Sequence, residues 1–139
     1  LQTLRQIEFA LFDMTLHQQA ARALAAGETN LVQRILDAVR AEVAVLLPPV
    51  FNRFQNSFSH IFAGGYAAGY YSYKWAEVLD ADAFAAFQEE GIFSTATAER
   101  FRREVLSQGD RRDAEELYQS FRGKKATIDA LLRRDGIER

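Results

Sequence analysis

Hydrophobic positions repeat with helical spacing along most of the chain. Between residues 30 and 46 the apolar side chains recur every three or four residues, which is the spacing of one face of an α-helix. They are Val32, Ile35, Leu36, Val39, Val43 and Leu46. Pro48 and Pro49 end this helix, because proline disfavours α geometry in the residue before it. No stretch of useful length alternates like a β-strand, so the sequence predicts an all-α fold.

The first segment predicts a helix with two apolar faces. One stripe contains Leu4, Ile7, Leu11 and Met14, and the other contains Phe9, Phe12 and Leu16. A helix that is apolar on two faces is usually buried between layers. We expect it to extend through the alanine-rich residues 20–26 and to end at Gly27. Asn30 and Gln33 then resemble a capping box at the start of the next helix.

The second half of the chain predicts one long helix and three shorter ones. The long helix carries an apolar stripe of Trp75, Leu79, Ala83 and Phe87 and ends near Gly91. The short helices have their apolar positions at Ala98, Phe101 and Val105, at Ala114, Leu117, Tyr118 and Phe121, and at Ile128, Leu131 and Leu132. Each is followed by a glycine, the residue that most often ends a helix.

Composition describes an ordinary globular protein. With 139 residues, 48% hydrophobic content and a net charge of −2, the chain predicts one helical region over residues 1–139 and no surface for nucleic acid. The absence of cysteine excludes disulfides and thiolate metal sites and fits a reducing, cytoplasmic location. No secretory signal is visible. Met14 is the only methionine, so we expect the chain to be a fragment or a processed product.

Residues 54–73 carry no formal charge, although 26% of the chain is charged. They contain four of the five tyrosines, three of the eight glycines and one of the two histidines. Ordering glycine costs conformational entropy and buried tyrosine hydroxyls need partners, so packing alone is a poor reason to concentrate both residue types here. We interpret this as the functional segment.

A helix from about residue 66 would place Tyr66, Tyr70 and Tyr73 on one face. Tyr71 and Trp75 would lie on another face, in the core. Gly64 and Gly65 allow a sharp entry, with flexibility added by Gly69, and His60 is close enough in sequence to reach the same cavity.

Neutral phenols and an imidazole that converge could stabilise an oxyanion without adding a permanent charge. The alternative is that the tyrosines pack a helix interface with their hydroxyls in water. A membrane-spanning role is disfavoured, because Gln55, Asn56, His60 and the tyrosines make the segment too polar.

The remaining polar groups have simple interpretations: His17 as a structural histidine, Glu77, Asp80 and Asp82 as a solvated helix face, and residues 122–125 as a charged helix end.

The segment Ser57–Tyr73 resembles a signature of the thimet-oligopeptidase-like zinc metallopeptidase family, in particular its oligopeptidase A-like branch. The similarity continues through Lys74–Leu79, Gly91–Phe93, Phe121–Gly123 and Asp129–Leu132, and it includes Gln6–Asp13 upstream. It covers essentially the whole chain. Ala126 and Asp110 depart from the family pattern, which puts the local loop geometry there in doubt.

The resemblance implies the C-terminal part of a clam-shaped, zincin-like helical peptidase domain that hydrolyses oligopeptides. It implies a zinc cofactor held by an upstream HExxH region, which this chain lacks, so the missing N-terminal part of the polypeptide would be its partner. By motif position, Tyr73 would donate to the oxyanion, with Tyr66 assisting and His60 contacting substrate near the scissile bond. Tyr70, Gly64, Gly65 and Gly69 would bind and enclose the peptide. The alternative function is a non-catalytic helical module that binds peptides or is purely structural.

Overall fold

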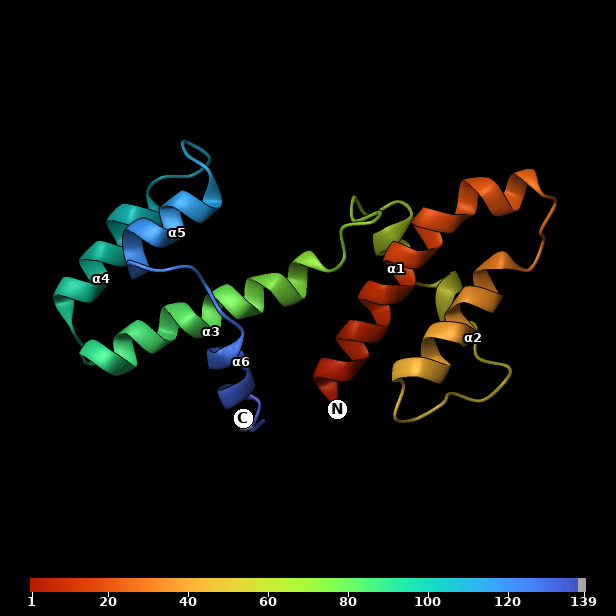
Figure 1. The fold of residues 1–139 in the computed structure, drawn as a ribbon, viewed down its shortest axis with the longest axis horizontal. Coiled ribbons are helices and arrows are strands. Elements are labelled where there is room, and N and C mark those ends of the chain that lie inside the picture. Colours follow the sequence, from red (N-terminus) through yellow and green to blue (C-terminus); the bar gives the residue numbers. More distant parts are fainter. Residues whose placement is uncertain (138–139) are drawn as a thin grey trace. The chain divides into compact units, whose positions relative to one another are not determined.

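The computed structural model describes residues 1–137, which form helices joined by turns, with no strand among them (Figure 1). The all-α prediction is confirmed. The helices are α1 (Gln2–Ala25), α2 (Leu31–Val43), α3 (Ser72–Glu90), α4 (Thr95–Phe101), α5 (Ala114–Arg122) and α6 (Asp129–Arg134), with short helical turns η1 (Phe54–Asn56), η2 (Ser59–Ile61) and η3 (Arg102–Leu106). The chain divides into two compact units, the first covering Leu1–Lys74 and the second beginning at Trp75.

The first unit is built on a hairpin of α1 and α2 (Figure 1). Its core joins one stripe of each helix to two residues of the segment that follows α2. The core residues are Phe9, Phe12, Leu16, Leu31, Ile35, Leu36, Val39, Phe58 and Ile61. The predicted stripe of α2 is therefore confirmed at Ile35, Leu36 and Val39.

A buried ion pair joins the two helices of the hairpin. Arg40 Nε donates to Glu8 Oε1 at 3.0 Å, and both side chains are almost fully buried. Because each charge would be expensive to bury alone, the pair constrains how α1 lies against α2.

Two expectations for this hairpin were wrong. Only the Phe9 stripe of α1 is buried, whereas Leu4 and Leu11 are exposed in this chain. Asn30 does precede α2, but its side chain makes no capping bond. Gln33 instead bonds Asp37 and accepts from Gln55, because the segment after α2 folds back over this helix.

In the second unit α3 is buried along a different stripe from the predicted one. Val78, Ala81 and Ala85 pack with Ala130 and Leu131 of α6. Trp75, placed in the core by the sequence pattern, is 53% exposed. Packing against α6 covers this stripe of α3 and selects the face that is buried.

Asp82 on the same helix is buried, which corrects the interpretation of a solvated face. Tyr118 Oη and the Arg122 guanidinium, both from α5, donate to its carboxylate. Arg122 is the last residue of α5, as expected for a charged helix end, but its side chain is buried. Burial alone opposes ionisation of Asp82, but these donors together outweigh it and hold the pKa of the carboxyl below its usual value.

Candidate functional site

The glycine pair Gly64–Gly65 closes a tight turn after η2. The Gly64 N–H donates to the Ser59 carbonyl at 2.9 Å and the Tyr66 N–H to the His60 carbonyl at 3.0 Å. A Cβ on Gly64 would lie 2.7 Å from the His60 Cα, so only glycine fits without moving backbone. Gly65 has a φ of +82°, which side chains disfavour. This turn brings His60 back beside Tyr66.

Gly69 differs from this pair. Its φ is not positive, and an added Cβ would make only ordinary contacts, the nearest with the Tyr66 carbonyl oxygen at 3.5 Å. Among the described non-glycine residues, the one with a positive φ is Ala68, at +53°.

The predicted helix from residue 66 was wrong, because residues 66–71 form turns and α3 begins at Ser72. The N–H groups of Ala68 and Tyr70 donate to the two carboxylate oxygens of Asp13, each at 2.9 Å. Asp13 lies on α1 and is fully buried. In a continuous helix these two N–H groups would donate to backbone carbonyls one turn earlier. Here they donate to the Asp13 carboxylate instead.

The turns nevertheless bring the predicted rings together. The Tyr66 and Tyr73 ring centroids are 4.9 Å apart, and those of Tyr70 and Tyr73 are 5.0 Å apart. His60 completes the group, with its ring centroid 6.2 Å from Tyr66 and 6.0 Å from Tyr70. We call His60, Tyr66, Tyr70 and Tyr73 the Tyr-His cluster. All four residues lie within the first compact unit.

Tyr70 is the most anchored member of the cluster. Its hydroxyl donates to Gln6 Oε1 at 3.2 Å. Its ring contacts Phe9 and Phe58 of the core edge-on. Partial burial raises the pKa of Tyr70 above its ordinary value. Tyr70 therefore links the cluster to the hydrophobic core.

Tyr73 is the most accessible of the three clustered tyrosines, with 40% of its surface exposed. A hydrogen bond with the Tyr66 side chain, assisted by partial desolvation, raises the pKa of Tyr73. Its phenol therefore stays protonated throughout the neutral pH range. Tyr73 also lies in the first turn of α3, where the helix dipole is positive. Together these features suit the binding of an oxygen that carries negative charge.

Tyr71 was expected in the core but is 54% exposed. The turns after Gly69 direct its neighbour Tyr70 into the core instead, because the Tyr70 N–H is held by Asp13.

The sequence analysis assigned no role to Asp13, whose carboxylate binds the N–H groups of Ala68 and Tyr70. A signal existed, since Asp13 is a charged residue between the buried positions Phe12 and Leu16. Its partners 55 and 57 residues away could not be identified from spacing. The structural interpretation of His17 is confirmed, because its Nδ1 lies 2.9 Å from both the Asp13 carbonyl oxygen and Asp13 Oδ1.

The described residues do not fit a zinc site. Within residues 1–137 no group of three or more histidine or acidic side chains is arranged to hold a metal ion. In the same range, no helix combines the length and the hydrophobicity that a bilayer crossing needs.

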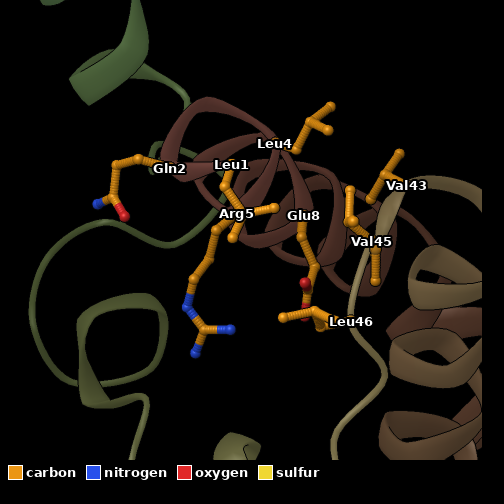
Figure 2. Close-up of a pocket in the computed structure, with 9 residues that line it drawn as sticks. Leu1, Gln2, Leu4, Arg5, Glu8, Val43, Val45 and Leu46 are labelled. Atoms are coloured by element: carbon orange, nitrogen blue, oxygen red, sulfur yellow. The ribbon is translucent and has the colours of Figure 1, made fainter.

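One further hollow lies apart from the cluster, between the start of α1 and the end of α2 (Figure 2). Leu1, Leu4, Val43, Val45 and Leu46 give it an apolar lining, with Gln2, Arg5 and Glu8 as its polar groups. None of the predicted site residues lines it.

Comparison with known proteins identifies the family. The sequence model of peptidase family M3 matches residues 1–137. The chain belongs to peptidase family M3. Its M3 relatives include oligopeptidase A from Haemophilus influenzae, which is 49% identical over 134 residues, or 96% of this chain. Oligopeptidase A from Salmonella typhimurium is 47% identical over 97% of the chain, and that from Escherichia coli is 46% identical over 97%.

The chain spans 19% of the length of each of these three relatives. The resemblance noted at Ser57–Tyr73 is thus confirmed at the level of the family.

Proposed function

We propose that this chain is the C-terminal part of the catalytic domain of an M3 zinc oligopeptidase that hydrolyses short peptides. Zinc and its ligands would belong to the remainder of the polypeptide. Family membership and the similarity to proteins named oligopeptidase A support this proposal. A cytoplasmic location is part of it, supported by the absence of cysteine.

The observation that carries the proposal is the contact between Tyr66 and Tyr73. Their rings lie 4.9 Å apart, and the bond between their side chains leaves one phenol able to donate outward. Attack on a peptide carbonyl creates negative charge on oxygen, and a fixed neutral donor stabilises that charge more than it stabilises the uncharged substrate. An aromatic cluster made only for packing would not need an exposed hydroxyl at this point.

Each member of the Tyr-His cluster then has a distinct role. Tyr73 donates to the oxyanion, and Tyr66 orients the Tyr73 hydroxyl or binds the substrate backbone. His60, exposed with its ring beside Tyr66 and Tyr70, contacts the substrate near the scissile bond. Tyr70 shapes the site from the core side, and Gly64 and Gly65 allow the segment to approach the peptide backbone closely.

Replacing Tyr73 by phenylalanine in the full-length protein tests this function. We expect turnover of an oligopeptide to fall by about 100- to 1,000-fold, because one oxyanion donor is lost. The melting temperature should change little, since the exposed ring is retained. The measurement is kcat and KM on a fluorogenic peptide, with thermal unfolding recorded on the same preparations.

Tyr71→Phe is the matched control, because it removes the same hydroxyl from a neighbouring tyrosine outside the cluster. Its kcat should remain within about twofold of wild type. Near-normal turnover of the Tyr73→Phe enzyme would exclude the assigned role.

A further inference from the structure

Asp13 is unusual in having both carboxylate oxygens occupied by backbone N–H groups of one distant turn. Oδ1 accepts from Ala68 and Oδ2 from Tyr70, each at 2.9 Å, and the side chain is fully buried. An ionised carboxylate forms stronger hydrogen bonds than a neutral acceptor. The two residues that it holds flank Gly69, in the middle of the turns that carry the Tyr-His cluster.

Backbone hydrogen bonds close these turns, while the N–H groups of Ala68 and Tyr70 donate to Asp13. Ala68 adopts a left-handed φ of +53°, which costs energy for a residue with a Cβ. The Gly69 N–H donates to the Tyr66 carbonyl at 2.8 Å, and the carbonyls of Gly69, Tyr70 and Tyr71 accept from the N–H groups of residues 72–74 at 3.1, 3.2 and 3.1 Å. The two Asp13 contacts on either side therefore oppose relaxation of the strained residue.

The direction of the carboxylate is itself fixed. His17, one helical turn later on α1, places Nδ1 2.9 Å from Asp13 Oδ1. The neighbouring residues Phe12 and Leu16 belong to the buried core of the first unit. The anchor is thus attached to a rigid helix rather than to another loop.

We infer that Asp13 is the positioning residue of the Tyr-His cluster: through Ala68 and Tyr70 it fixes the backbone that sets the distance between Tyr66 and Tyr73. The catalytic consequence rests on the proposed function. Asp13 contacts no substrate in this scheme and acts only through the tyrosines. The same anchor explains why residues 66–71 leave the helical path.

The test is a double-mutant cycle in the full-length enzyme between Asp13→Asn and Tyr73→Phe. Asparagine keeps the shape of aspartate but directs an amide NH₂ toward one of the two N–H donors. We expect kcat to fall at least about tenfold in the wild-type background, as for loss of a buried bond to a charged group. In the Tyr73→Phe background the same change should cost less than about threefold, because its target is already absent.

Hydrogen exchange supplies a readout that does not depend on activity. Peptides covering residues 66–71 should exchange at least about tenfold faster in Asp13→Asn, while α2 keeps its protection. Asp37→Asn, an exposed charge removal on α2, is the control and should alter neither exchange nor kcat. If Asp13→Asn does not fold, Asp13→Glu keeps the charge but displaces the oxygens, and it should give the same non-additive pattern.

Equal losses of kcat in both backgrounds, or unchanged exchange at residues 66–71, would overturn the inference. Failure of the proposed function has a different signature. Tyr73→Phe would then keep its turnover, while accelerated exchange in Asp13→Asn would still establish the anchor.

Discussion

At the scale of single residues, the glycines beside the Tyr-His cluster differ in how strictly the backbone requires them. Gly64 faces the His60 backbone at a distance that no Cβ tolerates, whereas Gly69 has room for one. The sequence pattern treated them alike, because both are glycines in an uncharged segment. Their difference is set by which backbone atoms the turn brings close.

This contrast predicts a large loss of stability for alanine at position 64 and a small change for alanine at position 69. Gly64→Ala should destabilise the first unit by about 1–3 kcal/mol, because backbone must move to admit the methyl group. It should also reduce turnover of the full-length enzyme by displacing His60. Gly69→Ala should change stability by less than about 1 kcal/mol in either direction. Urea unfolding and peptide-hydrolysis assays of both variants measure this, and similar losses in the two would show that the turn is not as tight as described.

At the scale of elements, buried charge pairs specify how helices meet. Glu8 with Arg40 fixes α1 on α2. Asp82 with Arg122 and Tyr118 fixes α3 on α5. The sequence pattern had placed Asp82 on a solvated helix face and Arg122 in a charged helix end. Packing of α5 covers Asp82, while Asp80 on the same helix remains exposed beside Arg134.

Asp82→Asn should therefore destabilise the chain by about 1–3 kcal/mol at neutral pH, since it removes the charged acceptor shared by Tyr118 and Arg122, while Arg122 keeps its ion pair with Glu89. Asp80→Asn, which removes an exposed partner of Arg134, should cost less than about 1 kcal/mol. Chemical unfolding at pH 7 distinguishes them, and equal costs would contradict the burial of Asp82.

The pH dependence of this pair follows from the sign of the pKa shift. The pKa of Asp82 is lower in the folded state than the roughly 3.9 of an unfolded chain. Its stabilisation is therefore fully present above about pH 4 and is lost as the pH falls through the folded pKa. The stability gap between wild type and Asp82→Asn should be constant from pH 7 to 5 and should narrow below pH 4.

At the scale of the whole molecule, the described residues expose several large apolar side chains. Leu1, Leu46 and Leu47 are exposed, and so are Leu4 and Leu11 on the second apolar stripe of α1. A helix apolar on two faces is expected between layers, and the described residues supply only one. We propose that the remainder of the M3 polypeptide covers the second face.

Residues 1–139 produced alone should consequently show no peptide hydrolysis above background, with or without added zinc. The full-length enzyme should hydrolyse the same oligopeptide, lose activity with a chelator and regain it with zinc. Parallel assays at equal protein concentration compare the two. Zinc-dependent hydrolysis by the short chain would contradict the division of the site proposed here.

The sequence by itself determined the helical class, the core stripe of α2, the buried face of α5 and the residues of the Tyr-His cluster. Helical periodicity and a locally unusual composition depend on neighbours along the chain, so they can be recognised without coordinates. Only the tertiary structure decided that residues 66–71 are turns, that Asp13 anchors them and that Asp82 is buried. Each of those outcomes depends on partners 36 to 57 residues away, and local propensity does not encode which distant group will accept a given backbone N–H or cover a given charge.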